Sequence, residues 1–111
     1  MDEDLPRLRS HIRIAALLRR ASAEGVFATV ARRGDADAGA LAVKVFIGAG
    51  QALLFVESRN ERGARIWRDQ FDGACEEARI DAYLAKEAIF DSDLWIIEIE
   101  DRDRHMRFDD L

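Results

Sequence analysis

The residues of this sequence that could do chemistry are concentrated in the stretch ARRGDADAGALAVKVFIG, residues 31 to 48. Asp35 and Asp37 lie between two glycines, and Lys44 follows in an alternating apolar run. Alternating oxygen side chains are typical of a calcium loop, whereas glycines at a fixed spacing are typical of a phosphate-binding loop. An acid and a strand lysine also form part of a metal-dependent nuclease site. Each of these chemistries requires further residues, which decide between them.

The calcium and phosphate alternatives both lack required residues. Gly39 stands where a calcium loop needs a third oxygen ligand, and no closing acid follows at the required spacing. Gly34 and Gly39 match the GxxxxG spacing, but Ala40-Leu41 follows instead of Lys-Ser/Thr. We therefore predict a hairpin turn, in which the glycines permit positive φ and the aspartates bond to nearby amides.

The nuclease alternative depends on Asp37, Lys44 and the order of the elements. Restriction-endonuclease-like folds share the order αβββαβ, hold a metal with acids near two adjacent strands and use a strand lysine. Ala42 stands where an acid usually precedes that lysine by two residues, so one metal ligand is missing. Since element order alone says little about function, we interpret Lys44 as a solvent-facing residue of a half-buried strand.

The remaining reactive side chains predict no catalytic, cofactor or metal site. A single cysteine, Cys75, cannot form an intramolecular disulfide and is typical of a reducing cytoplasm. His11 and His105 lie at opposite ends of the chain, so no Ser-His-Asp or Cys-His arrangement follows, and His11 is interpreted as a packed core histidine. The acids at 98 to 103 are interpreted as a solvated strand end. A role without catalysis is favoured.

Composition excludes several classes of protein. A chain of 111 residues can bury one modest core, which predicts a single domain over residues 1 to 111. The content of 49% hydrophobic and 35% charged residues is normal for a globular protein. Acids outnumber bases by 22 to 17, so the net charge of -5 disfavours binding of nucleic acid. No apolar window approaches about 18 residues, which disfavours membrane spanning and favours a cytoplasmic location.

Hydrophobic periodicity predicts an α+β fold in the order α-β-β-β-β-α-β. Short links between the first strands favour a mainly antiparallel meander with two helices packed on it. Trp95 shares a strand face with Ile97 and Ile99 and is predicted to lie in the core, whereas a solvated or frayed tail is predicted from about residue 103. The expected helices cover residues 8 to 24, with Pro6 suited to the first turn, and 72 to 89, capped by Asp72; the expected strands cover 26 to 30, 41 to 47, 52 to 57, 65 to 71 and 94 to 100.

The first helix has an apolar sector wider than one sheet face should need. We therefore predict a subunit interface there, and with it a homodimer. The candidate interface residues are Ile14, Leu17, Leu18 and Ala21.

Three segments together resemble a known family: RLRSHIRIAALLRRASAEGVFATVARRGDADAGALAVKV, IDAYLAKE and FDSDLWIIEIEDRDRH. They are similar to a small alphaproteobacterial family catalogued only as a domain of unknown function, in particular through RRGDxDAG and DLWxxEIEDR. The resemblance implies a cytoplasmic bacterial setting and supplies no activity, cofactor or catalytic set. We therefore expect an accessory or interaction protein that binds a protein partner or itself. The alternative is a metal-dependent nuclease, or a degenerate descendant that still binds nucleic acid.

Overall fold

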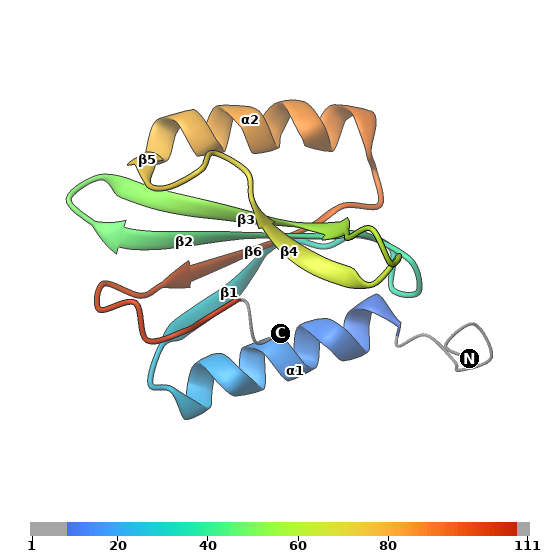
Figure 1. Cartoon of the computed structure of the whole chain (residues 1–111), viewed down its shortest axis with the longest axis horizontal. Helices are drawn as coiled ribbons and strands as arrows, with labels where there is room; N and C mark the ends of the chain where they lie inside the picture. Colours follow the sequence, from blue (N-terminus) through green and yellow to red (C-terminus); the bar gives the residue numbers. More distant parts are fainter. Residues whose placement is uncertain (1–8, 109–111) are drawn as a thin grey trace.

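The computed structural model describes residues 9–108, which form a six-stranded sheet between two helices (Figure 1). The predicted α+β class and the order of the main elements are confirmed, with a two-residue strand added before the second helix. The predicted helix start near Pro6 and Leu8 lies outside the described residues. The elements are α1 Ser10–Ala23, β1 Phe27–Arg32, β2 Leu41–Gly48, β3 Gln51–Arg59, β4 Arg65–Asp69, β5 Cys75–Glu76, α2 Glu77–Phe90 and β6 Trp95–Glu100.

The strands lie in the order β1-β6-β2-β3-β4, and β5 pairs with β3. The predicted antiparallel pairing of β2 with β3 is confirmed, and β4 extends it into a meander. The predicted hairpin between β1 and β2 is wrong, because β6 lies between them, antiparallel to β1 and parallel to β2. Alternation of apolar residues assigns each residue to a face of a strand but does not say which strand lies beside it. β6, the most apolar strand, lies inside the sheet with a strand on each side.

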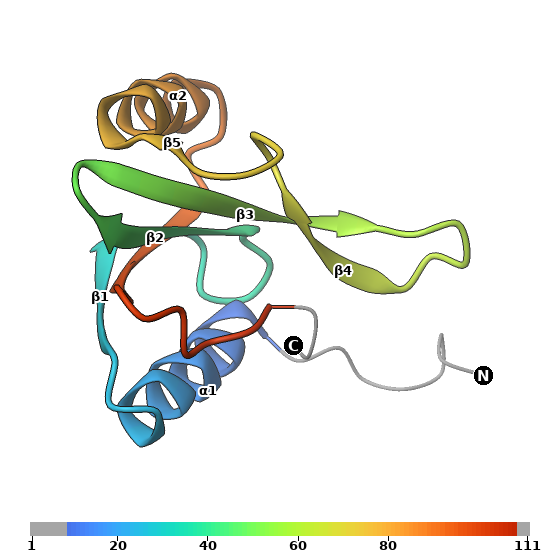
Figure 2. The same cartoon turned by 60° about the vertical axis from the view of Figure 1, so that its left-hand side comes forward.

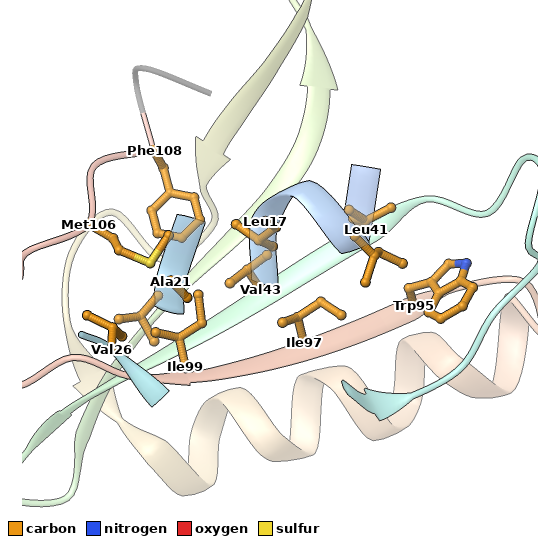
Figure 3. Close-up of a cluster of buried hydrophobic side chains, with 12 residues drawn as sticks. Leu17, Ala21, Val26, Leu41, Val43, Trp95, Ile97, Ile99, Met106 and Phe108 are labelled. Atoms are coloured by element: carbon orange, nitrogen blue, oxygen red, sulfur yellow. The ribbon is translucent and has the colours of Figure 1, made fainter. Parts of the chain in front are cut away.

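The larger hydrophobic core lies between the sheet and α1 (Figure 3). Ile97 is paired with Val43, and Ile99 with Val45, so these side chains share one face of the sheet. Leu17 and Ala21 of α1 complete this core from the helix side, and the predicted burial of Trp95 is confirmed by its exposed fraction of 2%. These contacts hold α1 against β1, β6 and β2.

The chain after β6 covers the rest of this face. The carboxylate of Asp101 accepts hydrogen bonds from the amides of His105 and Met106. Phe108 then stacks on Phe55 with a centroid distance of 4.5 Å and meets Trp67 edge-on. Met106 and Phe108 are both buried, so the predicted solvated tail from about residue 103 is wrong for these two residues. The residues from 109 on lie outside the described part.

A smaller core lies on the other face, where Ile80 and Leu84 of α2 pack above β2 and β3. The predicted cap at Asp72 is wrong, because Glu76 is the N-cap and Asp72 has a left-handed φ of 55° in the turn before β5. Among the described residues, no helix is long and apolar enough to cross a membrane.

Candidate functional site

The aspartate loop, residues 33 to 40, is a structural link between α1 and β6. The first amides of α1, at Ser10 and His11, donate to the backbone oxygens of Asp37 and Ala36. They need such partners because Arg9, the N-cap residue, provides no side-chain cap. Asp35 stabilises the loop itself, since its Oδ2 accepts from the amides of Asp37 at 3.1 Å and Ala38 at 2.8 Å. The loop therefore caps a helix with its carbonyl groups.

The side chains of Asp35, Asp37 and His11 differ in their contacts. Side-chain capping of the turn, predicted for both acids, is confirmed for Asp35 only. Asp37 is exposed, and its carboxylate lies 3.6 Å from Arg9. His11 is also exposed, with Nδ1 2.9 Å from the backbone oxygen of Ala36, so its predicted place in the core is wrong. The sequence signal, a histidine beside apolar residues, did not show that the loop would lie over this end of the helix.

Lys44 is buried rather than solvent-facing, with an exposed fraction of 4%. Its Nζ lies 2.7 Å from Asp81 Oδ1 and 2.8 Å from Glu77 Oε2, both on α2, and 3.6 Å from Glu98 Oε2. The prediction of a solvated lysine is wrong because α2 lies over this part of β2. Its ion-pair partners do not include Asp35 or Asp37, so the structure does not assemble the polar cluster of Asp35, Asp37 and Lys44.

The environment of Lys44 favours its charged form. Burial alone lowers the pKa of the Lys44 ammonium, but the hydrogen bonds that it donates to Asp81 and Glu77 and the charge of Glu98 outweigh burial and raise the pKa above its ordinary value. A lysine whose charged form is favoured in this way is a poor neutral nucleophile or base. In residues 9–108, no group of three or more His, Cys, Asp or Glu side chains is placed to hold a metal ion. Nothing in this part of the chain supports the nuclease alternative.

Part of the sheet face that α2 packs on, beside Lys44, is not covered by α2. We call this surface the acidic shelf; it comprises Phe27, Thr29, Glu98 and Glu100 on the sheet and Glu77 and Asp81 on α2. Phe27 is opposite Glu100 and Thr29 is opposite Glu98, so these four side chains share one face. Phe27 has an exposed fraction of 64%. A hollow of about 230 Å³ is lined there by Lys44, Phe46, Glu77, Glu98, Ile99 and Glu100.

A second hollow, of about 240 Å³, lies between the N-terminal half of α1, the aspartate loop and the β3–β4 hairpin. We call it the arginine hollow; its lining residues are Arg13, Ala38, Gly39, Ala40, Glu57, Ser58, Arg59 and Arg65. Glu57 Oε1 accepts from the amide of Leu41 at 2.9 Å, and Glu57 Oε2 contacts Arg13 Nη2. Arg65 Nε lies 3.6 Å from the same Oε2.

Both members of the central ion pair in this hollow are largely buried. The exposed fraction of the side chain is 14% for Arg13 and 11% for Glu57, compared with 37% for Arg65. Burial and the charge of Arg65 lower the pKa of Arg13 to about 10, so the guanidinium stays charged at neutral pH. Sequence reasoning missed this pair, although Glu57 alternates in phase with Leu53 and Phe55 on the core side of β3.

The predicted subunit interface on α1 is used inside the chain. Ile14, Leu17 and Ala21 are buried in the larger core, and Leu18 packs against it. The prediction that they form an exposed interface is therefore wrong for Ile14, Leu17 and Ala21. The apolar sector of α1 is wide because the chain after β6 contributes Met106 and Phe108 to the same core.

Comparisons with known proteins connect this arrangement to solved structures. A crystal structure of a DUF1491 family protein from Caulobacter crescentus CB15 is 48% identical, with a TM-score of 0.81 over 89% of this chain and 94% of that one. An NMR structure of a DUF1491 family protein from the same organism is 46% identical, with a TM-score of 0.77 and 91% of both chains covered. The solution structure of a protein from A. tumefaciens is 35% identical, with a TM-score of 0.74 over 86% of this chain and 87% of that one.

No curated protein matches the chain. The family model for DUF1491, a protein of unknown function, matches residues 8–109. The described helices and strands all fall inside the matched range. This match confirms the expectation from RRGDxDAG and DLWxxEIEDR that the chain is a domain of unknown function. The chain belongs to the DUF1491 family.

Proposed function

We propose that this protein is a small cytoplasmic bacterial accessory protein that acts through contact with a partner protein, and that the acidic shelf is its binding surface. The observation that carries this proposal is the exposure of Phe27, at 64%, on a sheet face that α2 leaves uncovered. A layered fold with helices on a sheet normally buries the apolar faces of that sheet. Here α2 covers β2, β3 and the start of β6 at Ile96, and the part of the face at Phe27 is open.

The position of β1 adds main-chain binding groups to this surface. β1 is the outer strand of the sheet, with β6 as its only strand neighbour in residues 9–108. Ala28 and Val30 point into the larger core, so Phe27 and Thr29 necessarily point to the uncovered face. An outer strand offers unpaired amide and carbonyl groups to an added segment. An aromatic side chain beside them supplies the apolar anchor that strong protein contacts require.

Charge indicates the chemistry of the partner segment. The shelf carries the carboxylates of Glu77, Asp81, Glu98 and Glu100, while Lys44 below it is the buried counter-charge. This excess of negative charge favours a basic segment with an apolar residue placed to contact Phe27. It also opposes the approach of nucleic acid, in line with the net charge of -5.

The experiment compares two exposed phenylalanines. Phe27→Ser removes the anchor of the shelf, whereas Phe90→Ser removes a phenylalanine that is 79% exposed at the far end of α2. Each variant and the wild type are used as bait in extract of Caulobacter crescentus, and captured proteins are quantified by mass spectrometry. We expect a partner that is enriched by the wild type and by Phe90→Ser and is lost with Phe27→Ser.

Two results contradict the proposal: equal capture by Phe27→Ser and the wild type, or loss of the partner with Phe90→Ser alone. Sedimentation of the purified protein serves as a separate measurement. A dimer that dissociates with Phe27→Ser but not with Phe90→Ser identifies a second copy of this chain as the occupant of the shelf. That result replaces the heterologous partner with self-association at the same surface.

A further inference from the structure

We propose that the arginine hollow binds an oxyanion, a carboxylate or a phosphate group, between Arg13, Arg59 and Arg65. This surface is distinct from the acidic shelf. Glu57, on the floor of the hollow, faces α1, whereas Lys44 and the shelf face α2. Figure 2 shows the β3–β4 hairpin extending beyond the rest of the sheet. The proposal stands whether or not the shelf binds a protein.

Strand register brings two of the arginines together. Arg59 and Arg65 are directly opposite each other at the end of the β3–β4 ladder. Paired residues point to the same side of a sheet, and like charges placed opposite each other destabilise the strand pair. Arg59 is in phase with Glu57, so both arginines lie on the side that faces Arg13. Arg59 Nη1 also donates to the backbone oxygen of Gly63 at 2.7 Å. Negative charge between the two side chains would offset their repulsion.

Glu57 does not supply enough negative charge. One of its oxygens accepts from the amide of Leu41, and the other contacts Arg13. The distance of 3.6 Å from Arg65 Nε to that second oxygen is longer than a hydrogen bond. One carboxylate therefore faces three guanidinium groups, and Arg65 is held near it by charge alone. Three guanidinium groups and one carboxylate line the hollow, in a chain whose net charge is -5.

Burial makes the excess positive charge unfavourable. Arg13 is 14% exposed, and both burial and Arg65 lower its pKa to about 10. An anion in the hollow would supply Arg13 with hydrogen-bond acceptors in place of water, and its negative charge would offset the repulsion from Arg65. Guanidinium groups bind carboxylate and phosphate through two parallel N–H donors, which favours these planar or tetrahedral oxyanions over a halide. The small residues Ala38 and Ala40 leave room for such a group in the volume of about 240 Å³.

The test follows the arginine side-chain Nε–Hε signals of the ¹⁵N-labelled full chain by NMR. Sodium phosphate and sodium acetate are added in separate titrations, with sodium chloride at the same ionic strength as the control. We expect saturable shifts of the Arg13 and Arg65 signals with phosphate, acetate or both, and no saturable shift with chloride. The salt that produces the shift distinguishes a phosphate from a carboxylate ligand. Shifts no larger than those with chloride overturn the proposal.

Three variants assign the binding to this hollow. Arg65→Gln should lower the affinity for the anion that produces the shift by about tenfold or more, since a charged hydrogen-bond donor is lost. Arg19→Gln, which removes an exposed arginine elsewhere on α1, should bind as the wild type does. Glu57→Gln should bind more tightly, because a competing carboxylate is neutralised. Equal weakening by Arg65→Gln and Arg19→Gln would assign the effect to net charge and would overturn the proposal.

The Glu57→Gln variant also separates binding from a purely structural role. A structural ion pair predicts that Glu57→Gln only lowers the melting temperature and leaves anion affinity unchanged or reduced. An unchanged or a reduced affinity would contradict the proposal that Glu57 and the anion compete for the same arginines. The melting temperature of each variant, measured with and without phosphate, shows that the compared proteins are folded.

Discussion

The indole Nε1 of Trp95 donates a hydrogen bond of 2.7 Å to the backbone oxygen of Asp35, sixty residues earlier in the chain. In return, the amide of Asp35 donates to the backbone oxygen of Asp93. The first residue of β6 and the aspartate loop are therefore joined from both sides. Since the same loop caps the first turn of α1, Trp95 stabilises a helix that is distant from it in sequence.

Substitution of Trp95 should separate packing from this hydrogen bond. Trp95→Ala should lower the free energy of unfolding by roughly 3–5 kcal/mol, as large core truncations do. Trp95→Phe retains an aromatic ring and should cost less, with about 1 kcal/mol of the loss due to the missing donor. Urea unfolding followed by circular dichroism measures both. A midpoint of thermal unfolding that changes by less than about a degree in Trp95→Ala contradicts the role of Trp95 in the core.

The two loop aspartates form a matched pair. Asp35→Ala removes an oxygen that accepts from two backbone amides and should lower the free energy of unfolding by about 1 kcal/mol. Asp37→Ala removes one exposed contact of 3.6 Å to Arg9 and should change the free energy of unfolding by less than about 0.5 kcal/mol. Both changes remove the same charge, so net charge cannot explain a difference. Equal effects in chemical unfolding would show that the Oδ2 contacts of Asp35 contribute nothing.

Gly39 tests how closely the loop approaches β6. A Cβ atom at Gly39 would overlap the backbone oxygen of Asp93 and press on the Trp95 ring. Gly39→Ala should therefore lower the free energy of unfolding by about 3 kcal/mol through overpacking. Gly63 is the control for backbone strain, because its φ is +77° and a Cβ atom added there would meet no other atom within 4 Å. Gly63→Ala should cost about 1 kcal/mol; an equal cost at both glycines would contradict the close approach.

Five of the six strands were predictable from sequence, whereas the neighbours of β6 were not. The alternation in β2 and β3 and the apolar run of β6 each depend on adjacent residues, so one sequence contains the signal. The insertion of β6 between β1 and β2 depends on contacts between distant segments. The loop at residues 33 to 40 has a length that suits either a hairpin or a link across the end of β6. The hairpin prediction was wrong for this reason.

Charged strand residues show the same limit. Alternation places Lys44 on the face opposite Val43 and Val45, but it does not show whether water or α2 covers that face. Its acidic partners come from α2 and β6, so their arrival depends on the whole fold. Glu57 was the more predictable residue, since an acid in phase with Leu53 and Phe55 indicates a buried counter-ion. The sequence does not show that Arg13 is that counter-ion.

Lys44 provides the last prediction, because its ion pairs should make stability depend on alkaline pH. Burial lowers the pKa of Lys44, but the hydrogen bonds that its ammonium donates to Asp81 and Glu77 and the charge of Glu98 outweigh burial and raise the pKa above its ordinary value in the folded state. The folded protein then holds this proton more strongly than the unfolded chain does. The stabilisation is complete below the unfolded pKa and is lost as pH rises through the folded pKa.

Lys44→Met should therefore lower the free energy of unfolding at neutral pH and flatten its decline above about pH 10. The loss at neutral pH should be about 1–2 kcal/mol, because the three carboxylates remain partly solvated after the ammonium is removed. Lys86→Met, at an exposed position on α2, is the control for loss of one positive charge. Tyr83, whose pKa is raised by burial and by Glu87, titrates in all three proteins and cancels in the comparison. Unfolding in urea at a series of pH values measures the free energy of unfolding of the three proteins as a function of pH. If the curves of the wild type and Lys44→Met ran parallel, the pKa of Lys44 would not differ between the folded and unfolded states.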